Sequence, residues 1–234
     1  MVCCSRLYPD LSFFQSASSY PCRELVGAVS GFENLRRRVE HSVLKSQNVG
    51  RNRLGITIAD YKRSRKPCDE YVVLEEGEEA HWEVVERMLF LYSKLNPGQG
   101  YVQGMNEIIG PIYYTFAADS SPQCQEYAEA DTFWCFNQLM GEIRDNFIKQ
   151  LDDSHCGIGM LMDRLMTLLK EKDTALWVKL HQQDLKPQYY GFRWIMLLLS
   201  QEFPLPDVIR LWDSLLADEN RFDFLIDVCC AMLL

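Results

Sequence analysis

Residues 96–106 read Asn-Pro-Gly-Gln-Gly-Tyr-Val-Gln-Gly-Met-Asn, and they separate two strongly apolar segments of the chain. Apolar residues before this stretch recur at the spacing of one helix face: Val84, Val85, Met88, Tyr92 and Leu95. The Asn-Pro-Gly sequence that follows them is typical of a helix end. Residues 108–116 are again mostly apolar. The sequence therefore predicts two core helices joined by a glycine-rich bend.

Gln103 lies in this bend, where a rigid scaffold can present a neutral amide to solvent. A carboxamide both donates and accepts hydrogen bonds, so it can orient a water molecule without titrating. The alternative is that Gln103 and Asn106 cap the following helix by accepting hydrogen bonds from its first free N–H groups. Spacing alone favours the capping role.

Helical periodicity continues through the rest of the chain. One apolar stripe comprises Phe133, Phe136, Met140, Ile143 and Phe147, with Asp131 or Thr132 placed as the helix N-cap. A second stripe, from Leu161 to Leu169, ends near Lys172, and Asp173 can cap a short helix after it.

The last third of the chain also predicts helices. Residues 189–199 are apolar nearly all round, which predicts one helix buried on every side. Pro204 and Pro206 then break the chain, and Asp207 is placed to cap the next helix. No segment alternates convincingly as a strand does. The predicted fold class is all-α, with many helices.

Composition excludes several chemistries. The chain of 234 residues has 47% hydrophobic content, four isolated histidines and nine cysteines at irregular spacing, with no Cys-x-x-Cys pair. These features predict no metal site, and the cysteines indicate reduced thiols in the cytoplasm. There is no phosphate-binding Gly-x-x-x-x-Gly-Lys-Ser/Thr loop, so no nucleotide cofactor of its own is predicted. The apolar runs are too short for a transmembrane segment, and the acidic pI, near 5.0, argues against nucleic acid as a partner.

Charge is unevenly distributed along the chain. Residues 36–66 carry ten Lys or Arg against two acidic residues, a formal charge of +8 in a chain whose net charge is −9. Ser, Asn and Gly are frequent within this stretch. These properties predict a basic, flexible and solvated loop at about residues 41–70. The alternative is that the basic loop contacts anionic lipid or an acidic face of a partner.

The bend resembles the signature of the TBC domain, the catalytic module of GTPase-activating proteins for Rab GTPases. That signature is Tyr-x-Gln-Gly followed by Met-Asn, and it stands here at Tyr101, Gln103, Gly104, Met105 and Asn106. Two further segments are similar to the family, Phe192-Arg193-Trp194 and Val208-Ile209-Arg210-Leu211-Trp212-Asp213. The resemblance covers nearly the entire chain, and the expected partial domain comprises residues 1–234.

The resemblance implies catalysis in trans on a GTP-bound Rab, which itself carries GTP and Mg. Such a protein activates its partner and has no substrate turnover of its own. Gln103 is implied as a glutamine finger that orients the attacking water, and Tyr101, Gly104 and Asn106 as residues that shape the loop, support it or touch the partner. The implied role is regulation of vesicle trafficking and intracellular protein transport, with membrane contact only peripheral, on endomembranes through the Rab partner.

The family's arginine finger is implied at Arg6, because Leu7-Tyr8-Pro9-Asp10 matches the family pattern downstream of that arginine. Upstream the chain departs from the pattern, since Cys3 occupies the position of an aspartate. We therefore expect a partial TBC domain, shortened at both ends. Two alternatives stay open: a noncatalytic Rab-binding or scaffold fragment, and a helical adaptor unrelated to GTPases.

Arg193, Trp194 and Asp213 belong to the matching segments but are expected to have structural roles. A charged group on a buried helix generally needs a partner, so Arg193 and Asp213 are each expected to form an internal ion pair or a helix cap.

Overall fold

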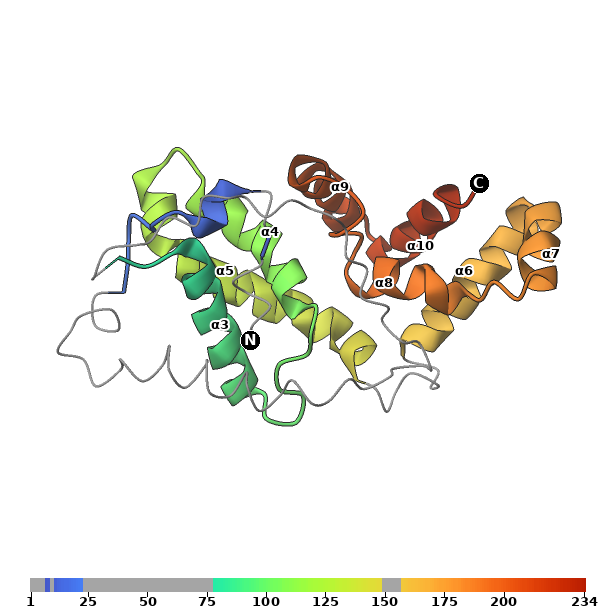
Figure 1. Ribbon diagram of the computed structural model, residues 1–234, viewed down its shortest axis with the longest axis horizontal. Helices are drawn as coiled ribbons and strands as arrows, with labels where there is room; N and C mark the ends of the chain where they lie inside the picture. The colour runs from blue at the N-terminus through green and yellow to red at the C-terminus, as the bar shows by residue number, and fades with distance from the viewer. Residues whose placement is uncertain (1–6, 9–10, 23–77, 149–156) are drawn as a thin grey trace. The chain divides into compact units, whose positions relative to one another are not determined.

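The computed structural model describes residues 7–8, 11–22, 78–148 and 157–234 (Figure 1). These residues fall into two compact units, one ending at Asn137 and the other beginning at Gln138. Within the described ranges the regular elements are helices, and the one extended pairing is an isolated bridge between Ala17 and Ala80. The all-α prediction is confirmed. The basic loop predicted at about residues 41–70 lies outside the described residues.

The first unit is built on α3 (His81–Leu95), α4 (Met105–Ala117) and the greater part of α5 (Pro122–Ile143). Helix α3 buries one face, Val84, Val85, Met88, Leu89 and Tyr92. The periodicity predicts four of these residues, but Leu95, predicted for the same face, is 63% exposed at the end of the helix. The helix ends at Asn96, whose backbone N–H donates to the Tyr92 carbonyl at 3.0 Å. The predicted helix end is therefore confirmed.

The N-terminal segment, residues 11–22, is fastened to the start of α3. It contains the short 3-10 helix η2 (Ser12–Gln15), which buries Phe14 completely. The backbone N–H of Ser18 donates to the Glu79 carbonyl at 2.7 Å, and the ring of Phe13 stacks on His81 at 4.1 Å. These contacts join residues that are more than sixty positions apart in the sequence.

Arg87 forms an ion-pair cluster with Glu79, which is buried, and Glu129, which is partly exposed. Its Nε and Nη2 donate to the Glu129 carboxylate at 2.8 Å and 2.7 Å, and its Nη1 pairs with Glu79. Burial disfavours the charge of Arg87, but the hydrogen bonds to Glu129 and Glu79 outweigh that effect and raise its pKa. Glu79 also accepts a hydrogen bond from the Cys22 backbone N–H at 3.0 Å. The cluster therefore ties the N-terminal segment, α3 and α5 together.

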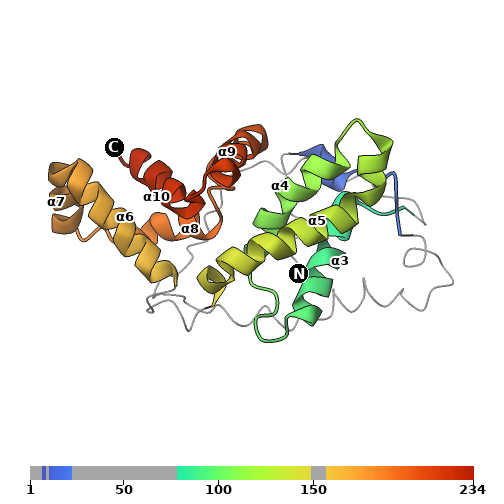
Figure 2. The same cartoon turned by 180° about the vertical axis from the view of Figure 1, so that it is seen from behind.

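The second unit contains the end of α5 and the remaining elements: η3 (Arg144–Phe147), α6 (Ile158–Lys172), α7 (Thr174–Gln182), η5 (Pro187–Tyr189), α8 (Gly191–Met196), α9 (Leu205–Ala217) and α10 (Arg221–Ala231). Helices α6 and α7 lie side by side in both views (Figures 1 and 2). Between them Asp173 accepts a hydrogen bond from the Leu176 N–H at 2.8 Å, so the predicted cap is confirmed.

The prediction of a single helix over residues 189–199 is wrong. Helix α8 ends at Met196, and Leu198 and Leu199 have left-handed φ angles of 49° and 61°. The break turns the Leu198 carbonyl toward the Trp212 indole, whose Nε1 donates to it at 2.8 Å. Tyr189 is also 62% exposed, so the segment is not buried on every side.

Two predicted helix starts are also wrong. Helix α5 begins at Pro122, which places Asp131 and Thr132 in its interior. Helix α9 begins at Leu205, with Pro204 as its N-cap, so Asp207 lies in the first turn and does not cap. In both cases a proline close to the true start supplies the first-turn φ angle of a helix. The predicted caps, Asp131 or Thr132 and Asp207, all lie beyond these starts.

Candidate functional site

The bend between α3 and α4 begins with a tight turn and contains two left-handed glycines. The backbone N–H groups of Gln99 and Gly100 both donate to the Asn96 carbonyl, at 3.1 Å and 2.8 Å. Gly100 has a φ of 67° and Gly104 a φ of 108°. Side chains rarely tolerate such angles, so these two positions require glycine. Glycine at positions 100 and 104 therefore allows the left-handed backbone conformation at both ends of this five-residue stretch.

Tyr101 and Asn106 hold the second half of the bend. The Tyr101 hydroxyl donates to Asn106 Oδ1 at 3.1 Å, and Asn106 Nδ2 donates to Glu107 Oε1 at 2.8 Å. Asn106 is only 2% exposed. Of the two roles that the resemblance left open for Asn106, the geometry favours support of the loop over contact with a partner.

Gln103 is exposed at the tip of the bend. Among the described residues none forms a hydrogen bond with its side-chain amide. The N-cap of α4 is Gly104, and no side chain caps this helix. The capping role considered for Gln103 and Asn106 is therefore wrong: Gln103 precedes the N-cap, and Asn106 lies inside the first turn of α4, where its side chain bonds Tyr101 and Glu107.

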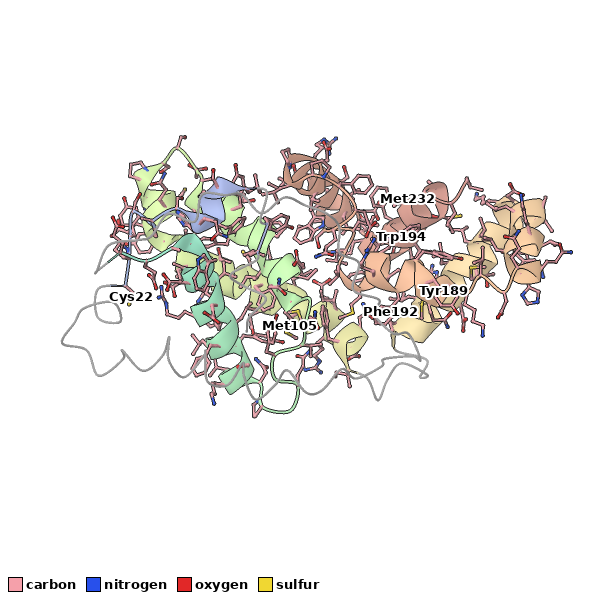
Figure 3. The ribbon with its side chains drawn as sticks, viewed as in Figure 1. Cys22, Met105, Tyr189, Phe192, Trp194 and Met232 are labelled. Carbon is pink, nitrogen blue, oxygen red and sulfur yellow. The ribbon has the colours of Figure 1, made fainter. Side chains whose placement is uncertain are left out.

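Met105 holds the bend from its buried side, a role that the sequence did not reveal. Its side chain is fully buried, and its sulfur accepts a hydrogen bond from the Val102 N–H at 3.4 Å. The Met105 N–H in turn donates to the Val102 carbonyl at 3.2 Å. Figure 3 shows Met105 at the start of α4. The exposed Gln103 thus stands between a buried anchor and a hydrogen-bonded tyrosine.

The family-motif residues of the second unit divide into paired and unpaired groups. Arg193 forms a bidentate ion pair with Glu202, with N–O distances of 2.7 Å and 2.9 Å, which is the kind of internal pairing expected for it. The Trp194 ring is tilted against Tyr190 at 5.5 Å. Asp213 is exposed on α9, and none of the residues described pairs with its carboxylate. The expected internal partner of Asp213 is therefore not found there.

Arg6 and Cys3 lie outside the described residues, so the structure does not place the implied arginine finger. Leu7 and Tyr8 are described, and Leu7 is fully buried. In the described part of the chain no group of His, Cys, Asp or Glu is arranged to hold a metal ion. None of the helices within those ranges is both long and apolar enough to span a bilayer.

The known proteins that are similar to this chain agree on one domain family. The sequence model of the Rab-GTPase-TBC domain matches residues 39–234. TBC1 domain family member 13 of Homo sapiens is 61% identical over 232 residues, which is 98% of this chain and 58% of that protein. The GTPase-activating protein GYP1 of Saccharomyces cerevisiae is 30% identical over 155 residues, covering 58% of this chain and 24% of that protein.

A solved structure is also similar. The crystal structure of the Ypt/Rab-GAP domain of Gyp1p superposes with a TM-score of 0.58 at 30% identity, covering 65% of this chain and 52% of that one. This chain spans less than two thirds of the length of these relatives.

Proposed function

This chain belongs to the Rab-GTPase-TBC domain family, and on that premise we propose that it accelerates GTP hydrolysis on a GTP-bound Rab-family GTPase. The observation that carries the proposal is the exposed amide of Gln103 on a bend that is fixed on both sides. A catalytic group that acts on a second protein must be both accessible and held in place. Gln103 meets both conditions.

In the proposed mechanism Gln103 orients the attacking water, and Arg6 neutralises charge that develops on the transferred phosphoryl group. The partner brings GTP and Mg. An arginine supplied in trans accelerates such reactions by about 10³ to 10⁵. This corresponds to roughly 4 to 7 kcal/mol of transition-state stabilisation. The amide of Gln103 remains neutral throughout, so its contribution does not depend on pH near neutrality.

The support around Gln103 favours a catalytic over a purely structural role. A loop residue loses little in orientation when its neighbours are already ordered, and here Tyr101, Met105 and Asn106 are all hydrogen-bonded. The energetic cost of ordering the loop is therefore met on folding and not during the reaction.

The proposed site of action follows from the partner. A Rab bound to an endomembrane would bring this chain to the membrane surface as a peripheral component, where the activation regulates vesicle trafficking. The chain then needs no membrane segment of its own to act there.

A second candidate function is Rab binding without catalysis. The observation that favours it is Cys3, which stands where the family pattern has an aspartate upstream of the arginine. If that aspartate normally holds the arginine loop, a cysteine lacks the charge to pair with it. In this case the chain would act as a scaffold that recognises a Rab but leaves its hydrolysis rate unchanged.

Single-turnover GTP hydrolysis across a panel of purified Rab GTPases tests both candidates. We expect the chain to accelerate hydrolysis on at least one Rab, and Arg6→Ala and Gln103→Ala each to abolish the acceleration. Gln123→Ala, at an exposed position in the first turn of α5, is the matched control and should behave as the unmodified chain. Binding without acceleration would favour the scaffold function, and absence of any Rab binding would exclude both.

A further inference from the structure

Gly110, in the middle of α4, packs closely against Leu7 and Tyr8 from the N-terminal part of the chain. A Cβ atom on Gly110 would stand 2.8 Å from Cε2 of Tyr8 and 3.2 Å from Cδ1 of Leu7. Both distances are shorter than carbon atoms adopt in ordinary van der Waals contact. The side chains of Leu7 and Tyr8 thus occupy the space in which any other residue at position 110 would place its own.

Aromatic side chains continue this contact along the same face of α4. We call the contact of Leu7 and Tyr8 with Gly110 the seat. The Tyr8 ring stacks on Phe14 with a centroid distance of 5.5 Å, and Phe14 lies 6.4 Å from the Tyr114 ring. Gly110 and Tyr114 are four residues apart, so they share one face of the helix. Leu7 and Phe14 are both fully buried. The contact is therefore a close-packed interface and not a loose approach.

The backbone of Tyr8 has an unusual conformation that needs support from its surroundings. Its φ is 42°, in the left-handed region that an aromatic residue rarely adopts. Its carbonyl accepts a hydrogen bond from the Leu11 N–H at 2.8 Å. A strained conformation persists only where the surrounding contacts over-determine it. The seat on Gly110 is one such contact.

We infer that Gly110 is a positioning residue, which seats Leu7 and Tyr8 on α4 so that this one helix supports both proposed fingers. The inference rests on the proposed function. Arg6 is joined to Leu7 by a single peptide bond, so their Cα atoms are about 3.8 Å apart. Gln103 directly precedes Gly104, the N-cap of α4, and six residues of helix rise correspond to about 9 Å between Gly104 and Gly110. Helix α4 therefore sets the distance between the two anchor points.

Helix propensity does not explain the glycine. Glycine inside a helix is less stable than alanine at the same place, so intrinsic preference would select alanine at position 110. Gly141, within α5, has open space where its Cβ would be. Gly141→Ala is therefore a control for helix propensity alone, since this second helical glycine can become alanine without a collision, whereas Gly110 also precedes Pro111, which itself disfavours a helical residue with a Cβ.

The seat itself is tested by amide hydrogen exchange on the full chain. We expect the Leu11 amide, which donates to Tyr8, to exchange faster in Gly110→Ala than in the unmodified chain, and Gly141→Ala to leave its exchange unchanged. Equal exchange in Gly110→Ala and Gly141→Ala would overturn the inference. If Gly110→Ala does not fold, Leu7→Ala removes the same contact from the opposite side and should produce the same change.

The effect on positioning is tested by single-turnover hydrolysis with a Rab that the unmodified chain activates. We expect Gly110→Ala to slow the stimulated step about 10- to 100-fold, with little change in the half-saturating concentration of Rab. Circular dichroism of Gly110→Ala at the assay temperature should match that of the unmodified chain, so that the slower step reflects positioning and not unfolding. A loss of acceleration that only parallels a loss of folded protein would mean general destabilisation and would overturn the inference.

The two hypotheses fail in distinguishable ways. If Arg6→Ala and Gln103→Ala retain full acceleration, the proposed fingers are wrong, and the part of the inference that concerns them is overturned with them. If those two variants lose acceleration but Gly110→Ala keeps it, only the positioning role of Gly110 is overturned.

Discussion

The hydroxyl of Tyr92 on α3 donates a hydrogen bond of 2.9 Å to Oε1 of Gln99 in the bend. The carbonyl of Tyr92 also accepts from the side-chain Nδ2 of Asn96 at 2.9 Å. Tyr92 is 3% exposed, and its ring meets Phe136 of α5 edge to face at 5.1 Å. A single core residue thus holds the first half of the bend at two points, as Tyr101 and Asn106 hold the second.

Tyr92→Phe should loosen the first half of the bend. The substitution keeps the ring in the core and removes one hydrogen bond, for which we expect about 1 kcal/mol of lost stability in urea unfolding. We also expect a several-fold slower stimulated hydrolysis, because Gln103 lies four residues beyond Gln99. Tyr190→Phe is the control, since that hydroxyl contacts only the Met166 sulfur among the described residues. An equal loss of hydrolysis in the two variants would contradict the link to the bend.

Tyr101 and Asn106 should be energetically coupled. Tyr101→Phe leaves the buried Oδ1 of Asn106 without this donor, which we expect to cost about 1 to 3 kcal/mol. Asn106→Ala should cost a similar amount, and the double variant less than the sum of the two. Urea unfolding of all four proteins in a double-mutant cycle gives the coupling, expected at about 0.5 to 3 kcal/mol. Strictly additive losses would show that the hydrogen bond contributes nothing.

Glu202→Gln should destabilise the second unit through its pair with Arg193. The pair is bidentate and Glu202 is only 11% exposed, although Arg193 is half exposed and solvent screens its charge. We therefore expect a loss of about 1 kcal/mol, near the upper limit for surface pairs. The control is Asp145→Asn, which breaks an exposed pair with Arg144 at 3.7 Å and should change stability very little. Thermal unfolding of both variants measures the difference, and equal shifts would exclude the role assigned to Glu202.

His81 should make the protein less stable in mild acid. Burial lowers the pKa of His81 from its ordinary value near 6.5 to about 4. The unfolded chain therefore takes up a proton below about pH 6.5 that the folded chain does not bind until about pH 4. The stability associated with neutral His81 is fully present above pH 6.5 and is lost progressively as the pH falls through that window.

The pH effect is measured by urea unfolding at about pH 7 and about pH 5.5, where each unit of pH is worth up to about 1.4 kcal/mol for one such group. His81→Phe keeps an aromatic ring against Phe13 and should reduce this pH dependence. If the variant and the unmodified chain lose equal stability over the same interval, His81 is not the responsible group.

The sequence predicted most of the helices because their signals are local. The face of α3, its end at Asn96 and the cap at Asp173 all depend on residues within a few positions of one another. The break after Met196 could not be predicted in this way. It is stabilised by the Trp212 indole, fourteen residues beyond the carbonyl that it binds, and the local apolar run gives no sign of that contact.

In the candidate site too, features set by neighbouring residues could be predicted and those set by distant contacts could not. The position and exposure of Gln103 follow from a short motif and two glycines, which sequence reasoning can recognise. The contacts that support Gln103 do not follow from the motif. Gln99 is bonded by Tyr92 of the preceding helix, and the role of Gly110 is recognisable only from its contacts with Leu7 and Tyr8. These contacts depend on packing between elements, so a single sequence without a structure could not reveal them.

The cluster of Arg87, Glu79 and Glu129 has a consequence for how the first unit unfolds. One guanidinium serves two carboxylates, and Glu79 also binds the N-terminal segment through the Cys22 N–H. If α5 detached alone, Arg87 would lose one of its two carboxylates, and if the N-terminal segment detached alone, the buried Glu79 carboxylate would lose the Cys22 N–H donor; either loss is energetically costly. Detachment of either element alone is therefore unfavourable. The N-terminal segment, α3 and the adjoining part of α5 should melt together in one cooperative transition.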